Sequence, residues 1–160
     1  MIKKNARILF VDDSVTTRRI LKKYLSEEGF TNTDEAPDGE VAWGKLLGGN
    51  PKFAVVFADW HMPKLNGLEL LIKIRGRDEF KNLIFIMTTC ERKKEEVEKA
   101  IRAGATGYIV KPFEPQTIYE FLKKFETTPP IFSEQADFSQ EVNEMIHISE
   151  LSKKKHDIGL

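Results

Sequence analysis

The sequence contains one cysteine, no long apolar run and no excess of charge of either sign. Cys90 has no second cysteine to pair with, so an internal disulfide is excluded and a reducing compartment is favoured. No stretch approaches the ~20 apolar residues that span a bilayer, and the apolar run at residues 8–11 is too short for a secretion signal. Lys and Arg number 25, as do Asp and Glu, so there is no global positive field to attract nucleic acid or anionic lipid. We therefore expect a cytoplasmic protein that binds neither nucleic acid nor membrane.

The chain length of 160 residues is sufficient for one domain with a full core. Pro129-Pro130 marks a boundary. We predict a domain over residues 1–127 and a C-terminal extension over residues 128–160, part disordered or a short amphipathic helix. If the extension folds back over an apolar patch around Phe121, it would cover part of a partner surface.

Short apolar runs without apolar/polar alternation predict strands that are buried on both faces, as in a parallel sheet. Four such runs occupy residues 8–11, 53–58, 83–87 and 108–110, and the more polar residues 31–36 predict an edge strand. Between these runs, apolar residues recur at helical spacing. The stripes are Ile20, Leu21, Tyr24 and Leu25; Val41, Ala42 and Leu46; Leu68, Leu71 and Ile72; Val97, Ala100 and Ile101; and Ile118, Leu122 and Phe125. Strand and helix alternate five times, which predicts an α/β fold, a doubly wound parallel sheet with helices on both faces.

Polar residues stand at the end of each of the four apolar runs. They are Asp12 and Asp13, Asp59, Thr88 and Thr89, and Lys111. The carboxyl ends of parallel strands lie on one edge of the sheet, which is where ligands bind in open α/β folds. We therefore expect three carboxylates, a hydroxyl and an ammonium group in one crevice.

This set of side chains suits phosphoryl transfer. Three clustered carboxylates repel one another and need a cation, and their oxygen-only ligand set favours Mg²⁺, or Mn²⁺. A carboxylate beside such a cation can attack phosphorus to give an acyl phosphate. The metal and a lysine would neutralise the phosphoryl oxygens, while a hydroxyl donates a hydrogen bond to one of them.

The motifs at these positions resemble the response regulator receiver family, most closely its chemotaxis members of the CheY type. They are Phe-Val-Asp-Asp-Ser at 10–14, Asp-Trp-His-Met-Pro at 59–63 with Asn-Gly-Leu at 66–68, Thr89, and Gly-Tyr-Ile-Val-Lys-Pro-Phe at 107–113. The resemblance covers residues 6–125, and the ordered set is far more specific than any one of its parts. It implies a flavodoxin-like, five-stranded sheet in the order 2-1-3-4-5.

The resemblance also implies the roles of individual residues at the site. Asp59 would be the phosphoacceptor and, with Asp13 and the backbone carbonyl of His61, a direct ligand of Mg²⁺. Asp12 would act on the metal through bound water, and Lys111 would pair with the phosphate.

Three further residues are assigned by the same likeness. Thr89, rather than Thr88, corresponds to the switch hydroxyl, because it lies 22 positions before Lys111. Tyr108 corresponds to the aromatic residue that turns inward when that threonine moves. Pro112 corresponds to a cis-proline that follows Lys111.

Three residues near the site are expected to modulate the lifetime of the phosphorylated state: His61, Cys90 and Glu91. His61 and Cys90 depart from the residues usual at their positions in the family. We expect His61 to be an exposed loop residue that obstructs the attacking water, and Cys90 to be a small buried residue.

The implied function is that of a single-domain response regulator, which is not an enzyme apart from catalysing its own phosphorylation and dephosphorylation. A histidine kinase or phosphotransfer domain would donate the phosphoryl group, and the face made by the fourth helix, fifth strand and fifth helix would then change its affinity for a target. The expected target is a flagellar motor switch component, with a phosphatase as a possible further partner. The alternatives are a phosphorelay intermediate or phosphate sink and, in a different class, an aspartyl phosphatase of the haloacid dehalogenase type. The latter expects Asp-x-Asp where this chain has Asp12-Asp13-Ser14.

Overall fold

The computed structural model describes residues 2–50, 52–90 and 93–124. Its sheet has five parallel strands in the order β2-β1-β3-β4-β5, which confirms the predicted fold class and strand order. The strands are β1 (Arg7–Val11), β2 (Thr33–Ala36), β3 (Phe53–Asp59), β4 (Ile84–Thr89) and β5 (Gly107–Val110).

A helix follows each strand. The helices are α1 (Val15–Glu27), α2 (Gly39–Gly48), α3 (Gly67–Arg75), α4 (Lys94–Arg102) and α5 (Pro115–Lys124), and a 3-10 turn, η1 (Asp78–Phe80), precedes β4. Side chains at three N-caps bond the first turn: Ser14 accepts from Thr17 N–H, Asp38 from Val41 N–H, and Asn66 from Glu69 N–H. These caps explain why the helices begin directly after short loops at the carboxyl edge of the sheet.

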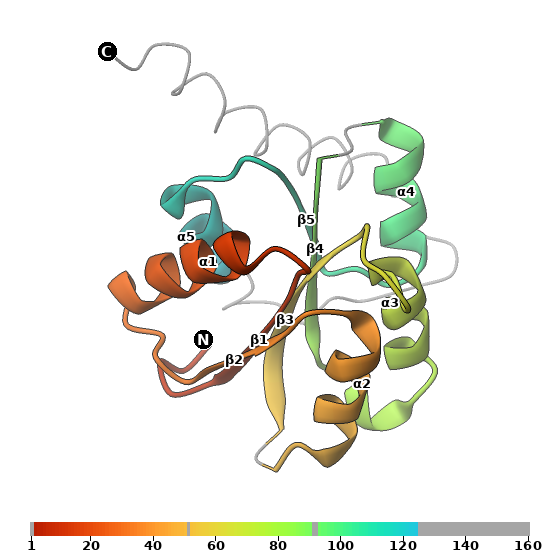
Figure 1. The fold of residues 1–160 in the computed structure, drawn as a ribbon, viewed down its shortest axis with the longest axis horizontal. Coiled ribbons are helices and arrows are strands. Elements are labelled where there is room, and N and C mark those ends of the chain that lie inside the picture. Colours follow the sequence, from red (N-terminus) through yellow and green to blue (C-terminus); the bar gives the residue numbers. More distant parts are fainter. Residues whose placement is uncertain (1, 51, 91–92, 125–160) are drawn as a thin grey trace.

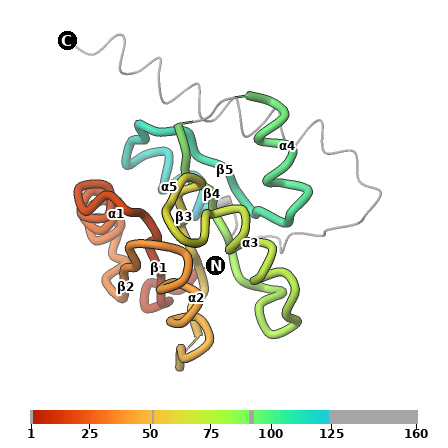
Figure 2. Tube along the Cα trace, turned by 45° about the vertical axis from the view of Figure 1, so that its right-hand side comes forward, coloured from red at the N-terminus to blue at the C-terminus, as the bar shows by residue number. Residues whose placement is uncertain are grey.

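The helices form one layer on each face of the sheet. In Figure 1, α1 and α5 lie on one side, and α2, α3 and α4 lie on the other; the turned view in Figure 2 keeps the same division. Each layer has its own apolar core. Phe10, Phe57 and Ile86 point toward α1 and α5, whereas Val56, Phe85 and Met87 point toward the opposite layer. The central strands are therefore buried on both faces, as their unbroken apolar runs predicted.

Three residues of the predicted helical stripes lie outside the core. Ile20, Val41 and Ile72 are exposed, Ile72 by 56%, because each stands at the side of the buried stripe and faces solvent. The cores instead contain the neighbours Leu21, Ala42 and Leu71.

The prediction of an apolar surface patch around Phe121 is wrong. Phe121 is 1% exposed, belongs to the core between the sheet and α1 and α5, and lies against Gly107 of β5. The predicted extension at residues 128–160, and the proposed helix within it, lie outside the described residues.

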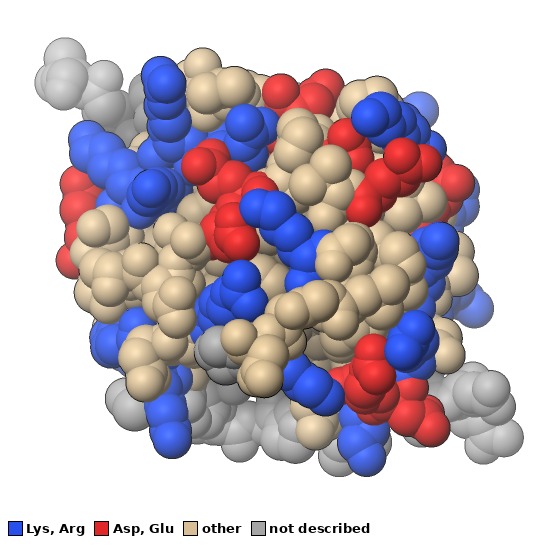
Figure 3. All heavy atoms as spheres, turned by 60° about the horizontal axis from the view of Figure 1, so that its bottom comes forward, with Lys and Arg blue, Asp and Glu red and all other residues tan. Residues whose placement is uncertain are grey.

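Surface charge is mixed. On the face shown in Figure 3, Lys and Arg side chains are interspersed with Asp and Glu, as the balanced composition predicted. Among the residues that the structure describes, no helix has the length and apolarity needed to cross a membrane.

Candidate functional site

Three carboxylates meet at the carboxyl edge of the sheet, as predicted. β1 and β3 are neighbours with Val11 opposite Ala58, so the residues that follow, Asp12 and Asp59, lie side by side. One oxygen each from Asp12, Asp13 and Asp59 lies within 4.8 Å of the others. Asp12 and Asp59 are 1% and 8% exposed, whereas Asp13 is open to solvent. The cluster is thus accessible from one side only.

Lys111 supplies a positive charge to two of these carboxylates. Its Nζ lies 2.6 Å from Asp12 Oδ2 and 3.3 Å from Asp59 Oδ2. Burial raises the pKa of Asp59 and the charge of Asp12 adds to this, while Lys111 and the backbone N–H of His61 act in the opposite direction. Burial acts to lower the pKa of Lys111, but its hydrogen bond to Asp12 and the charge of Asp59 outweigh burial, so this pKa is raised. Lys111 therefore stays charged at neutral pH and serves as the counter-ion of the cluster.

The loop after β1 is held in place by Arg18, a residue that the sequence analysis missed. Its guanidinium donates to the backbone carbonyl of Asp12 and forms an ion pair with Glu35 of β2 at 3.0 Å. The Ser14 N–H donates to Asp12 Oδ1 at 2.8 Å. These contacts hold the Asp12 carboxylate in place. In the sequence, the role of Arg18 was indicated only by its position one turn into α1.

The loop after β3 depends on a close approach that only glycine permits. Trp60 N–H donates to the Thr88 carbonyl at 3.0 Å, and Gly67 N–H donates to the Trp60 carbonyl at 2.9 Å. A Cβ at Gly67 would lie 2.3 Å from the Asp59 carbonyl oxygen. Gly67 thus lets α3 start directly beside the end of β3. The Asn66-Gly67 motif contained this signal, although the sequence analysis gave it no role.

Thr88 and Thr89 end β4 and are both buried, at 1% and 0% exposure. Lys111 N–H donates to the Thr89 carbonyl at 2.8 Å, which joins β4 and β5 at the site. Tyr108 is 1% exposed and its ring lies in the core on the α2–α3–α4 side. The Lys111–Pro112 peptide bond is cis.

The residues expected to modulate the site have different positions. His61 is exposed and its ring stacks on Trp60 at a centroid distance of 6.3 Å. The prediction that Cys90 is buried is wrong: its side chain is exposed, because β4 ends at Thr89 and the chain turns to the surface there. Glu91 lies outside the described residues.

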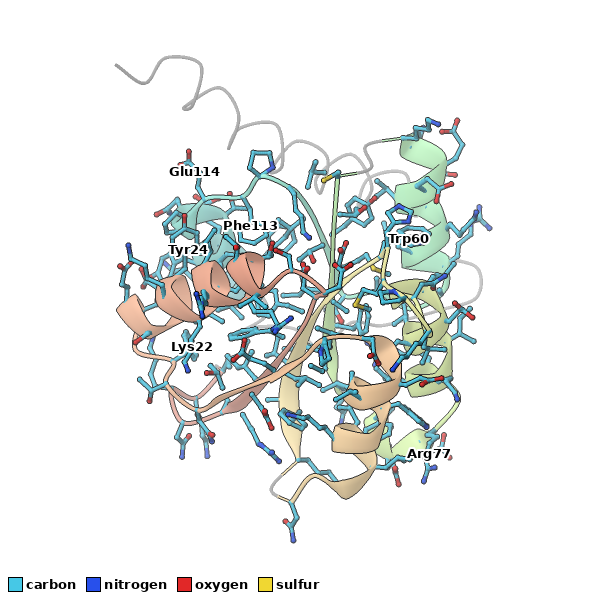
Figure 4. The ribbon with its side chains drawn as sticks, viewed as in Figure 1. Lys22, Tyr24, Trp60, Arg77, Phe113 and Glu114 are labelled. Carbon is cyan, nitrogen blue, oxygen red and sulfur yellow. The ribbon has the colours of Figure 1, made fainter. Side chains whose placement is uncertain are left out.

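Two aromatic side chains flank the upper end of the sheet in Figure 4. Trp60 lies on the side of α4, whereas Phe113 lies over α1 and α5. Trp60 packs against one core and Phe113 against the other. The acidic cluster is thus bordered by apolar packing on both faces.

The family follows from comparison with known proteins. Residues 8–123 match the family model described as the response regulator receiver domain. The chain belongs to the response regulator receiver family. It is 46% identical over 124 residues to the chemotaxis protein CheY-3 of Vibrio cholerae, covering 78% of this chain and 94% of the relative. Its identity to the chemotaxis protein CheY of Pseudomonas aeruginosa is 44% over 118 residues, covering 74% and 94% respectively.

Solved receiver structures share the fold. One is a complex of CheX, CheY, BeF3 and Mg²⁺ from Borrelia burgdorferi, with a TM-score of 0.72 and 32% identity over 77% of this chain and 90% of that one.

The donor set of this receiver domain fits a divalent cation. Asp12, Asp13 and Asp59 offer only carboxylate oxygens, which a hard ion such as Mg²⁺ prefers. Two of the three carboxylates are buried and already share the cation of Lys111. Asp13 is exposed, so the cluster reaches solvent at this residue. The further ligand that the resemblance implied, the His61 carbonyl, stays a prediction.

Proposed function

We propose that this receiver domain is a signalling switch that accepts a phosphoryl group on Asp59. The observation that carries this proposal is the placement of Asp59 at the end of β3, beside Asp12 and within 3.3 Å of the Lys111 ammonium. The cluster provides a nucleophile and a fixed cation in a largely buried place, which phosphoryl transfer requires.

In the phosphorylation step, an Asp59 carboxylate oxygen attacks the phosphorus of a phosphohistidine. The new P–O bond forms as the P–N bond breaks, and the histidine nitrogen leaves and takes up a proton. Bound Mg²⁺ would neutralise charge on the phosphoryl oxygens, held by Asp13, Asp59 and the His61 carbonyl, with Asp12 acting through water. Lys111 moves its contact from the carboxylates to the phosphoryl group.

Hydrolysis removes the phosphoryl group from Asp59. Water attacks phosphorus, the bond from phosphorus to Asp59 breaks, and Asp59 leaves as a carboxylate with inorganic phosphate as the product. His61 is exposed and lies two residues after Asp59, and we expect its ring to obstruct this water. The domain therefore has no separate substrate and catalyses only its own phosphorylation and dephosphorylation.

The switch transmits the effect of phosphorylation from Asp59 to the surface of α4, β5 and α5. Thr89 ends β4 next to the site, and Tyr108 of β5 packs in the same core as Val97 and Ile101 of α4. A Thr89 hydroxyl that is drawn toward the phosphoryl group favours the inward position of the Tyr108 ring, which the unphosphorylated structure already shows. The equilibrium between two surface states then shifts toward the state with Tyr108 inward.

The relatives suggest the process and the partners. Because chemotaxis proteins of the CheY type are 44 to 46% identical to this chain, we place it in chemotaxis. A histidine kinase or phosphotransfer domain is the donor, and a flagellar motor switch component is the target. A structural neighbour is complexed with CheX, which makes a CheX-like phosphatase a further candidate partner.

The test is labelling of the full chain by a small phosphodonor in the presence of Mg²⁺. We expect one phosphoryl group per wild-type chain and none on Asp59→Ala. Asp13→Ala is the matched control for the metal, since it keeps the nucleophile but should be labelled only slowly at any Mg²⁺ concentration. Stoichiometric labelling of Asp59→Ala would overturn the assignment of the acceptor.

The phosphorelay alternative is separated by a second measurement. Chain labelled on Asp59 is mixed with an unphosphorylated histidine phosphotransfer domain. Rapid return of the phosphoryl group to histidine would favour a relay or phosphate sink, whereas release of inorganic phosphate alone supports a terminal switch.

A further inference from the structure

One buried side chain near the site has no polar partner among the residues that the structure describes. The buried polar and charged residues are Asp12, Asp38, Asp59, Thr88, Thr89, Thr106 and Thr117. Lys111 pairs with Asp12 and Asp59, Val41 N–H bonds Asp38, and Phe85 N–H bonds Thr106 Oγ1 at 3.0 Å. Thr89 and Thr117 also have interaction partners. Of these seven side chains, only the Thr88 hydroxyl has no hydrogen bond to another residue that the structure describes, although Thr88 is 1% exposed.

The sheet places Thr88 directly beside the acceptor. In the pairing of β3 and β4, Phe57 lies opposite Ile86 and Asp59 lies opposite Thr88. Phe57 and Ile86 point toward α1 and α5. Because side chains alternate along a strand, Asp59 and Thr88 point to that same face.

The contacts of Lys111 place Thr88 beneath an ion pair. Lys111 follows β5, Asp59 ends β3, and β4 lies between these two strands. The 3.3 Å contact from Lys111 Nζ to Asp59 Oδ2 therefore crosses β4. Thr88 is the residue of β4 that stands opposite Asp59, so its side chain lies under this bridge.

A buried hydroxyl without a partner destabilises the fold, whereas valine would fill the same volume without this cost. This loss of stability is offset only if the hydroxyl donates a hydrogen bond in another state of the site. Phosphorylation produces such a state, because Lys111 then turns to the phosphoryl oxygens. The acyl oxygen that remains on Asp59 loses its ammonium contact and needs a donor.

We propose that Thr88 donates a hydrogen bond to the acyl oxygen of phosphorylated Asp59, a role separate from the switch hydroxyl of Thr89. This inference rests on the proposed phosphorylation of Asp59. The acyl oxygen becomes a carboxylate oxygen when the phosphoryl group leaves, and a hydrogen bond to a charged acceptor is stronger than one to a neutral acceptor. While the P–O bond breaks, Lys111 still contacts the phosphoryl group, so the hydrogen bond from Thr88 stabilises the charge that develops on the leaving carboxylate and shortens the lifetime of the phosphorylated state. The bond is lost when Lys111 returns to Asp59, as in the unphosphorylated structure.

The first test compares Thr88→Val, which keeps the shape and removes the hydroxyl, with Thr88→Ser, which keeps the hydroxyl. After labelling with a small phosphodonor and Mg²⁺, the Val variant should hold its phosphoryl group about 2- to 10-fold longer than wild type, the range expected for one hydrogen bond. The Ser variant should have a lifetime close to that of wild type.

The second test reports the hydrogen bond itself. Isotope-edited infrared difference spectra of the phosphorylated and unphosphorylated chain resolve the acyl carbonyl stretch. We expect this band at a higher wavenumber in Thr88→Val than in wild type, with its position restored in Thr88→Ser. A purely structural role for Thr88 would leave the band unchanged.

Unfolding of the unphosphorylated chain without Mg²⁺ adds a matched control. Thr88→Val should be as stable as wild type or more stable, because it removes an unbonded hydroxyl. Thr106→Val should be less stable, because it removes the acceptor of Phe85 N–H.

The outcomes separate the two proposals. A labelled Thr88→Val chain with the lifetime and carbonyl band of wild type overturns the role of Thr88 and leaves Asp59 as the acceptor. A wild-type chain that takes up no phosphoryl group on Asp59 overturns both.

Discussion

Arg75 and Lys111 are two partly buried cations of this fold that are held in different ways. Arg75 Nε donates to the Gly104 carbonyl at 2.9 Å, and its two terminal nitrogens donate to the Phe80 and Leu83 carbonyls at 3.0 and 2.8 Å. Lys111 contacts the side chains of Asp12 and Asp59. The acceptors of Arg75 are fixed by the backbone, whereas the acceptors of Lys111 are carboxylates that can exchange one cation for another. The buried charge of Arg75 therefore stabilises the fold, whereas we propose that the charge of Lys111 takes part in a reaction.

The two regions also differ in what they leave unsatisfied. The Thr106 hydroxyl beside Arg75 accepts a hydrogen bond from Phe85 N–H, while the Thr88 hydroxyl has none with the described residues. Burial lowers the pKa of Arg75 to about 10, which still leaves it charged at neutral pH. The Arg75 region is therefore a structural contact, and we propose that the Lys111 region binds further groups.

The largest expected effect is the loss of Arg75. Arg75→Met removes the Arg75 donor from the Gly104, Phe80 and Leu83 carbonyls, of which the Phe80 carbonyl keeps the bond from Leu83 N–H. We expect the free energy of unfolding to fall by roughly 3 kcal/mol. Urea denaturation measures this value. Arg77→Met is the matched control: the Arg77 side chain is 46% exposed and pairs with Glu79, so its loss should cost less than about 1 kcal/mol. Equal losses in the two variants would contradict the structural role of Arg75.

The loss of stability in Lys111→Met should be smaller than that in Arg75→Met, and its size should depend on Mg²⁺. In a chelator, Asp12 and Asp59 lose their shared cation, and the free energy of unfolding should fall by about 1–3 kcal/mol. Saturating Mg²⁺ should recover much of this loss, because the ion replaces the missing charge. Lys64→Met, which removes a 59% exposed lysine that lies 3.7 Å from Asp38, should change stability by no more than about 0.5 kcal/mol. The same defect with and without Mg²⁺ would argue against a cation at this cluster.

In a chelator, Asp59→Asn should be more stable than wild type, by less than the changes expected for Arg75→Met and Lys111→Met. Because burial raises the pKa of Asp59, the folded state binds more protons than the unfolded state between the unfolded pKa and the raised one. The stability of wild type therefore falls as pH rises through that interval. The advantage of Asp59→Asn should be greatest at neutral pH and should shrink as pH falls toward the ordinary pKa of about 3.9.

Urea titrations of both chains across this pH range check the prediction for Asp59. Added Mg²⁺ should stabilise wild type more than Asp59→Asn, which reverses or narrows the difference. A variant that is less stable than wild type at neutral pH in a chelator would show that ionised Asp59 carries no net cost.

The smallest expected effect is a change in Trp60 emission when Mg²⁺ binds. Trp60 follows the acceptor and is 6% exposed, whereas Trp43 lies on α2 and packs edge-to-face on Phe80. Trp60→Phe should lose the Mg²⁺-dependent change, and Trp43→Phe should keep it. A full response in Trp60→Phe would mean that Trp43 is the reporter.

Much of the fold and of the site could be predicted because both depend on short-range patterns. The unbroken apolar runs of β1, β3 and β4 followed from burial on both faces, and the polar residues after them marked the carboxyl edge. The exposure of Ile72 and Cys90 and the burial of Phe121 could not be predicted. The spacing of apolar residues predicts the middle of the buried face of a helix, but it does not predict whether residues at the edge of that face are buried. The surface position of Cys90 depends on where β4 ends.

By itself, the sequence determined which residues reach the functional edge: Asp12, Asp13, Asp59, Thr89 and Lys111. Tertiary structure alone decided their partners. The strand order β2-β1-β3-β4-β5 places β4 between β5 and β3, and this arrangement brings Lys111 across Thr88 to Asp59 and Asp12. The physical reason is that periodicity acts between residues a few positions apart, whereas the Lys111–Asp12 contact joins residues 99 positions apart, and only the packed sheet brings such residues together.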